Sequence, residues 1–167
     1  GEDRRVAWER VPGGRPLAMS RDGSAVAAAK NSESICLLDP ATGEERAMVP
    51  AAHVSAAAFG PDGDTIAVAG REAVVLHDKT EGWAAATDWP APAAANALAF
   101  APKGEHLAAA FDDGTLRVWN VRSKELVLDV HGRQEALLAV AWLDDERVAA
   151  GGRDPDRGPP VYVWRLP

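Results

Sequence analysis

A turn signal recurs along this sequence every 40 or 41 residues, and no other feature restricts the fold so strongly. The four copies are Arg21-Asp22-Gly23, Pro61-Asp62-Gly63, Pro102-Lys103-Gly104 and Leu143-Asp144-Asp145. A fixed period of this length indicates one supersecondary unit repeated along the chain. We therefore interpret the 167 residues as four copies of one unit.

Each turn lies between two short apolar segments, and an alternating segment follows them. In the third copy these segments are ALAF, EHLAAA and TLRVWN, and a fourth, ELVLDV, comes after them. Ala-rich pieces such as GSAVAAAK favour helix on propensity alone. The apolar runs nevertheless end after roughly 4–7 residues at a Gly, Pro or Asp-Gly, which is strand length. Four short strands joined by turns are typical of one antiparallel β-propeller blade.

The sequence thus predicts an all-β protein, a single-domain β-propeller of four-stranded antiparallel blades in four repeats. We place the blades at about 15–50, 53–90, 95–131 and 136–166. The fourth copy contains only three segments before Pro167. We expect residues 4–11 (RRVAWERV), or another chain, to supply its last strand.

The third copy, PKGEHLAAAFDDGTLRVWN, resembles the blade of the WD-repeat β-propellers. Asp113-Gly114-Thr115 fits the second turn of that blade, and Trp119-Asn120 stands where the family has Trp-Asp. Trp164-Arg165, His77-Asp78 and Leu38-Asp39 are weaker matches. The resemblance covers essentially the whole chain and implies a scaffold or regulatory role, as one part of a larger bacterial signalling polypeptide.

The family often links each blade by hydrogen bonds among His, Ser or Thr, Trp and Asp, and most of that network is missing here. Ala52, not Gly, precedes His53, and His131 precedes Gly132 instead of following it. We therefore expect apolar packing to hold the blades together. The expected core residues are Phe59, Phe100 and Trp142 from first strands, Ile66, Leu107 and Val148 from second strands, and Met19 or Leu17 in the first copy.

Four blades leave three arrangements open, because WD-repeat rings usually have seven or eight. The chain is the C-terminal half of a longer polypeptide, or it pairs with a second copy in an eight-bladed ring, or it closes as a four-bladed ring. In both closed versions residues 4–11 pair with strand 161–166.

The charge balance disfavours polyanionic partners. There are 18 Lys and Arg against 25 Asp and Glu, a formal net charge of −7. Nucleic acids and anionic membranes need a basic footprint, so we expect neither as a partner. Cys36 lies in the apolar run SICLL and is expected to be a buried, unreactive thiol in a cytoplasmic protein.

A search for chemistry finds no catalytic motif and predicts no enzyme, cofactor or metal. Gly-x-Ser-x-Gly, a phosphate-binding glycine loop and His-Glu-x-x-His are all absent from the sequence. His53, His77, His106 and His131 fall in different copies or between them, without metal-ligand spacing.

Binding is instead expected at the loops that join second to third strands, together with the connections between blades. The resemblance implies that these segments share one end of the ring, which we call the loop face. Its mixed charges suit a protein partner. The candidate residues are Arg71, Glu72, Asp112, Asp113, Arg133, Arg153, Asp154, Asp156 and Arg157.

Two tryptophans bracket the fourth segment of the second copy. Trp83 and Trp89 are six residues apart, so strand alternation places them on one side of it. They are expected either to pack against a neighbouring strand or to anchor a protein interface.

The leading functional hypothesis is a non-catalytic interaction scaffold or regulatory module that presents propeller loops to a protein partner. The alternative is a half-propeller whose main partner is a second copy. A hydrolase or lyase in the central channel is less favoured, because the segments expected near the axis are mostly Ala, Val, Leu and Phe.

Overall fold

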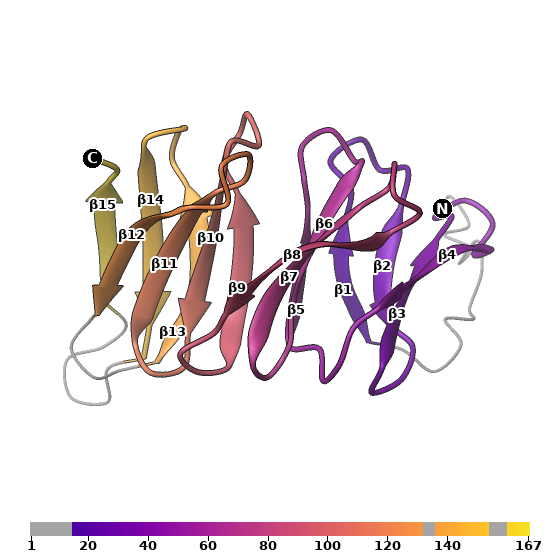
Figure 1. The fold of residues 1–167 in the computed structure, drawn as a ribbon, viewed down its shortest axis with the longest axis horizontal. Helices are drawn as coiled ribbons and strands as arrows, with labels where there is room; N and C mark the ends of the chain where they lie inside the picture. The colour runs from indigo at the N-terminus through magenta and orange to yellow at the C-terminus, as the bar shows by residue number, and fades with distance from the viewer. Residues whose placement is uncertain (1–14, 132–135, 154–159) are drawn as a thin grey trace, which may run out of the picture.

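The computed structural model describes residues 15–131, 136–153 and 160–167, and every regular element in them is a β-strand (Figure 1). The strands are β1 (Pro16–Met19), β2 (Val26–Ala29), β3 (Ser34–Leu38), β4 (Glu45–Pro50), β5 (Ala56–Phe59), β6 (Thr65–Ala69), β7 (Ala73–Asp78), β8 (Ala84–Pro90), β9 (Ala95–Phe100), β10 (His106–Phe111), β11 (Thr115–Asn120), β12 (Leu126–His131), β13 (Leu137–Trp142), β14 (Arg147–Gly152) and β15 (Val161–Arg165). The all-β prediction is confirmed.

The strands form four antiparallel sheets in sequence order. Three sheets have four strands each, β1–β4, β5–β8 and β9–β12, and the fourth contains β13–β14–β15. The first strands meet in the order β1, β5, β9 and β13. In Figure 1 the first and last sheets lie at opposite ends of the row. The described residues therefore do not close into a four-bladed ring, and the pairing predicted for residues 4–11 lies outside them.

Three of the four recurring turn signals share a left-handed glycine, and three have an Asp that accepts a backbone N–H. Gly23, Gly63 and Gly104 have φ values of 72°, 75° and 78°, a left-handed conformation that glycine adopts without a Cβ clash. Asp22 Oδ1 accepts the backbone N–H of Ser24 at 3.0 Å, and Asp144 Oδ1 accepts that of Glu146 at 3.0 Å. These Asx-type bonds explain why Asp-containing turns repeat with the strands.

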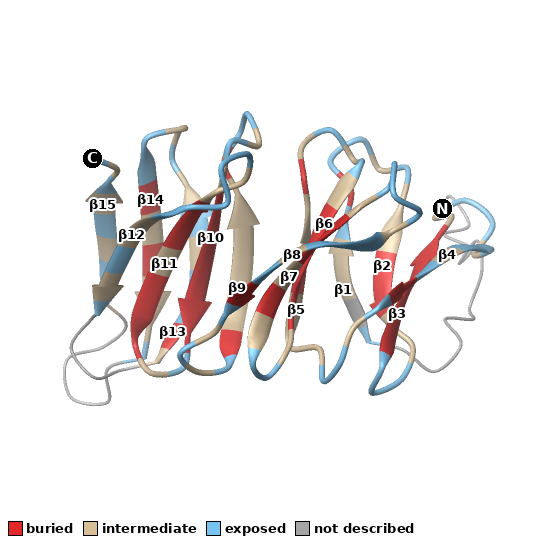
Figure 2. Cartoon of the chain, in the orientation of Figure 1, coloured by how far each residue is buried: buried red, intermediate tan, exposed pale blue. Residues whose placement is uncertain are grey.

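Small side chains allow the sheets to pack closely. Ala67 and Ala69 of β6 are fully buried, as are Ala108, Ala109 and Ala110 of β10. Figure 2 shows that burial concentrates in the second and third strands of the sheets. The alanines favour helix by propensity, but here tertiary packing decides, because a sheet covered on both faces needs small residues.

Three apolar clusters lie between successive sheets. Ile66 and Val68 face the first sheet, whereas Ala67 and Ala69 face the third. Leu107 packs in the cluster of the second and third sheets, and Val148 in that of the third and fourth. The predicted second-strand core residues Ile66, Leu107 and Val148 are all fully buried.

The core residues predicted on the first strands are found in the apolar clusters, and the structure decides between Leu17 and Met19 in the first sheet. Phe59, Phe100 and Trp142 pack as partly buried residues at the edges of the clusters. Leu17 packs in the first cluster, whereas Met19 is 64% exposed. Of the two alternatives for the first sheet, Leu17 therefore takes the core position. Cys36 is buried as expected.

The prediction that Trp83 and Trp89 lie on one side of their strand is wrong. Trp83 packs toward the first sheet, and Trp89 toward the third. The pairing of β7 with β8 shifts register between Leu76 and His77. An extra residue at a bulge breaks strict alternation, so a spacing of six no longer means one face. Both rings do pack within the protein, as one of the two interpretations expected.

Candidate partner-binding face

Backbone hydrogen bonds join the loops of one sheet to the chain that leads to the next. Ala51 N–H, after β4, donates to Glu33 O of the β2–β3 loop at 2.9 Å. Ala91 N–H, after β8, donates to Glu72 O of the β6–β7 loop at 2.9 Å. The loops and connections therefore form one surface, at the lower end of the molecule in Figure 1.

A second set of bonds ties the same loops to the start of each first strand. Asp112 N–H donates to Ala94 O at 2.9 Å, and Arg153 N–H donates to Ala136 O at 3.3 Å. Buried or paired backbone groups of this kind hold a loop in one conformation. We call this set of hydrogen-bonded loops and connections the bonded frame of the loop face; the side chains of the loop residues project from it.

The structure places four predicted residues on this frame with exposed side chains: Arg71, Glu72, Asp112 and Arg153. Asp113 is half-buried and its carboxylate accepts the N–H of Thr115 at 2.9 Å, so it shapes the β10–β11 turn. The remaining four candidates, Arg133, Asp154, Asp156 and Arg157, lie outside the described residues.

Two polar contacts that the sequence did not indicate support the frame. Asn96 Nδ2 donates to Leu137 O at 2.9 Å, which links β9 to the next sheet. A hydrogen bond of 2.7 Å joins Thr115 Oγ1 to His131 Nδ1 within the third sheet. Asn96 was not singled out, because a single polar residue in a strand carries no local signal. The bond between Thr115 and His131 retains one His–Thr contact of the kind that the family network uses, although His131 precedes Gly132.

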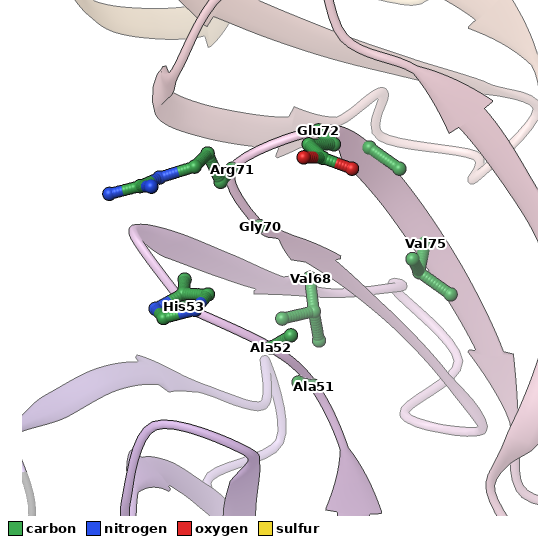
Figure 3. Close-up of a pocket in the computed structure, with 9 residues that line it drawn as sticks. Ala51, Ala52, His53, Val68, Gly70, Arg71, Glu72 and Val75 are labelled. Atoms are coloured by element: carbon green, nitrogen blue, oxygen red, sulfur yellow. The ribbon is translucent and has the colours of Figure 1, made fainter.

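A pocket of about 320 Å³ lies on the loop face between the first and second sheets (Figure 3). Val68 and Val75 line it from β6 and β7, and Ala51 and Ala52 from the connection after β4. His53, Arg71 and Glu72 stand at its polar edge. In Figure 3 the side chains of Arg71 and His53 extend toward the same side of the pocket.

Gly70 forms part of the pocket wall. Any other residue at this position would force the neighbouring backbone to move. A Cβ on Gly70 would lie 2.7 Å from the backbone oxygen of Ala52. The same relationship recurs in the fourth sheet, where a Cβ on Gly152 would lie 2.2 Å from Ala136 O. At both places the end of a second strand lies close to the chain that leads into the first strand of the same sheet.

His53 holds a left-handed backbone conformation, with φ of 51°. Such a conformation costs a non-glycine residue on the order of 1–3 kcal/mol and marks functional positions more often than chance. The N–H of His53 donates to Ser32 O at 2.8 Å, which fixes the turn against the first sheet. The imidazole is thereby directed outward beside Arg71.

The titratable groups give no sign of a reaction centre within the described residues. No three His, Cys, Asp or Glu side chains there could hold a metal ion together. Burial raises the pKa of the Cys36 thiol, so the less reactive protonated form dominates at neutral pH. Burial also lowers the pKa of His77, whose Nδ1 lies 3.1 Å from the carbonyl oxygen of Trp83.

Repeated antiparallel sheets, packed face to face with first strands adjacent, define a β-propeller. The family model described as the anaphase-promoting complex subunit 4 WD40 domain matches residues 58–145, just over half of the chain. The chain belongs to this WD40 family. The resemblance seen in the turns and in Trp119-Asn120 is confirmed.

Among solved structures, the chain is similar to one from Kuenenia stuttgartiensis hydrazine synthase, with a TM-score of 0.80 and 18% identity. The match covers 99% of this chain and 49% of the other, so the chain spans about half the length of that relative. At this identity the likeness concerns the fold alone. No curated protein matches the sequence. In the part of the chain that the structure describes, no helix is long and apolar enough to cross a membrane.

Proposed function

We propose that this protein is a non-catalytic interaction module that binds a protein partner through the loop face. WD40 propellers commonly mediate contacts between proteins, which gives the class of function. The observation that carries the proposal is the bonded frame, which presents Arg71, Asp112 and Arg153 from three different sheets. A rigid surface loses little conformational entropy on binding, which favours affinity.

The charges on this face suit a protein more than a polyanion. The exposed residues of the loop face carry both signs, and an Arg-rich stripe is not present in its described part. Mixed charges set the orientation and specificity of a protein complex. The free, buried Cys36 is compatible with a reducing compartment, and we place the module in the cytoplasm.

A charge-matched pair of variants tests the loop face. One variant carries Arg71→Ala, Asp112→Ala and Arg153→Ala. The control carries Arg21→Ala, Glu81→Ala and Arg122→Ala, which also removes two arginines and one carboxylate but from loops at the opposite end. Both are used for affinity capture from cells of the source organism, with quantitative mass spectrometry and circular dichroism to confirm folding.

We expect the loop-face variant to lose at least one protein that the wild type and the control retain. A loss of 1.4 kcal/mol in binding corresponds to about tenfold in affinity, which quantitative capture resolves. Retention of every wild-type partner by the folded loop-face variant would refute the proposal.

A second candidate is self-assembly into an eight-bladed ring, and a different observation favours it. Among the described strands β15 pairs only with β14, and Val161 and Val163 are 74% and 55% exposed. An exposed apolar edge strand is a surface for pairing with another chain. Light scattering decides this point, because a dimer has twice the 17.6 kDa of one chain. A strict monomer at working concentration eliminates the two-chain ring.

A further inference from the structure

We propose that the pocket between the first and second sheets binds a short aliphatic side chain of a partner peptide, with a carboxylate on the adjacent residue. This inference rests on the proposed loop-face function, because Arg71 and Glu72 belong to both. It goes further by naming the chemistry that the partner must carry.

The floor of the pocket sets the preference for an aliphatic group. Val68, Val75 and Ala73 present only hydrocarbon to the space. Its volume of about 320 Å³ lies at the lower end of the range of roughly 300–1,000 Å³ found for ligand pockets. A leucine, isoleucine or valine side chain gains free energy on leaving water for such a hydrocarbon surface.

The edge of the pocket sets the preference for an anion. The Arg71 and His53 side chains form no hydrogen bond or ion pair with the described residues, and both extend to the same side (Figure 3). A guanidinium binds a carboxylate through two parallel N–H donors, a geometry that lysine lacks. Glu72, which is also exposed, repels a second anion and so restricts the carboxylate to the side of Arg71 and His53.

The second and third copies of the repeat differ at the position of Gly70 in the pocket wall. Phe111, the last residue of β10, corresponds to Gly70, which lies 41 residues earlier and directly follows β6. Phe111 is fully buried and packs edge-on against Trp119, at 6.5 Å between ring centroids. A side chain at position 70 would instead meet the backbone oxygen of Ala52, 2.7 Å from its Cβ.

The backbone of His53 is left-handed, as it also is at Trp83 and Lys124, and it fixes where the imidazole stands at the pocket edge. The φ of 51° directs a polar ring to the edge of an apolar pocket, and the backbone bond to Ser32 O maintains it. A glycine would accept this conformation without strain. A histidine there adds a hydrogen-bond donor beside Arg71.

Three blocked tetrapeptides test the two halves of the proposal. Ala-Leu-Asp-Ala carries both groups, Ala-Leu-Asn-Ala lacks the carboxylate, and Ala-Ala-Asp-Ala lacks the aliphatic group. Each is titrated into the ¹⁵N-labelled full chain, and binding is followed by the amide resonances of Gly70, Ala73 and Ala52. A dissociation constant on the order of a millimolar is measurable in this way.

We expect Ala-Leu-Asp-Ala to bind at least about fivefold more tightly than either control peptide, a difference of about 1 kcal/mol. Arg71→Ala should abolish the preference for Asp over Asn but keep that for Leu over Ala. Ala73→Leu places a side chain into the pocket and should abolish binding of all three. Circular dichroism confirms that this variant, which alters a half-buried position, is folded.

Equal binding of the three peptides, binding detected at other amides, or no binding would each overturn the proposal. Failure here is distinguishable from failure of the loop-face function. If the peptides do not bind at the pocket but the loop-face variant still loses its protein partner, the function stands and the pocket chemistry is wrong.

Discussion

The indole rings of Trp89 and Trp119 stack across the boundary between the second and third sheets, with centroids 5.1 Å apart and planes inclined by 20°. Both rings are buried, and Trp89 Nε1 donates to the carbonyl oxygen of Lys124 at 2.9 Å. Trp119 stands at the position of the family's Trp-Asp. The family tryptophan therefore acts here through packing against the fourth strand of the preceding sheet.

Replacing Trp89 should destabilise the protein strongly. Trp89→Ala removes a buried ring, its stacking partner and one hydrogen bond, and truncations of this kind cost about 3–5 kcal/mol. Urea unfolding followed by circular dichroism measures the loss. Trp89→Phe keeps an aromatic ring and should lose less. Trp164→Ala, at a half-buried position of the last sheet, is the matched control. Equal losses for Trp89→Ala and Trp164→Ala would contradict the importance of the stacked pair.

Gly70 should not tolerate a methyl group. A Cβ there lies 2.7 Å from Ala52 O, so the loop or the connection must move. Overpacking of this kind costs about 1–3 kcal/mol, and the free energy of unfolding of Gly70→Ala should fall by that amount. Gly151→Ala is the control, because its nearest contact, Pro160 O, is at 3.4 Å. We expect that variant to differ from wild type by no more than about 0.5 kcal/mol. Equal losses in the two variants would contradict the close approach at Gly70.

Stability should decrease as the pH falls through the titration of His77. Burial lowers the pKa of His77 in the folded protein, and Nε2 has no hydrogen-bond partner among the described residues. Below about pH 6.5 the unfolded chain takes up a proton that the folded protein does not. The unfolded state then binds more protons than the folded state, so the free energy of unfolding decreases as the pH decreases.

His77→Phe removes the group that titrates and keeps an aromatic ring in the buried position of the imidazole. Urea unfolding at about pH 7.5 and about pH 5.5 should show a smaller pH dependence for the variant than for the wild type. The carboxylates whose pKa values are lowered titrate below this window and do not obscure it. Identical pH dependence in the two proteins would rule out a protonation penalty at His77.

The Asp22 carboxylate should titrate well below the ordinary pKa of an aspartate, 3.8. Its pKa is lowered to about 2, first by the backbone N–H of Ser24 and then by the hydroxyl of Ser20 at 2.7 Å. NMR titration of the side-chain carboxyl resonance measures this value. Ser20→Ala should raise the pKa of Asp22 but leave it below 3.8, because the N–H of Ser24 remains. An unchanged pKa in Ser20→Ala would mean that the hydroxyl does not contribute.

The repeated sheets were predictable because their signals are local. A glycine at Gly63 or Gly104 serves a left-handed turn whatever surrounds it. Alternation around Thr115 to Asn120 indicates a strand, although the structure buries residues on both of its faces. The family resemblance follows from the same residues. Ile66 and Leu107 were also predictable as core residues, because a second strand has neighbouring strands on both sides and its apolar side chains are therefore buried.

Features that depend on two distant segments were not predictable. The pocket is lined by β6, β7 and the connection after β4, and the approach of Gly70 to Ala52 is not visible within any one of these segments. The bulge between β7 and β8 moved Trp83 to the opposite face from Trp89, since register is fixed by the partner strand. Arg71 and Glu72 were identified as loop-face residues, but their pocket was not.

The distribution of side-chain sizes within each sheet has a geometric consequence. Alanines such as Ala67 and Ala109 fill the boundary at the second strands, whereas the indoles of Trp89 and Trp119 fill it at the outer strands. At this boundary the bulkiest stacked pair therefore lies at the third and fourth strands, away from the first strands. Side-chain sizes of this kind set the small rotation between neighbouring repeats.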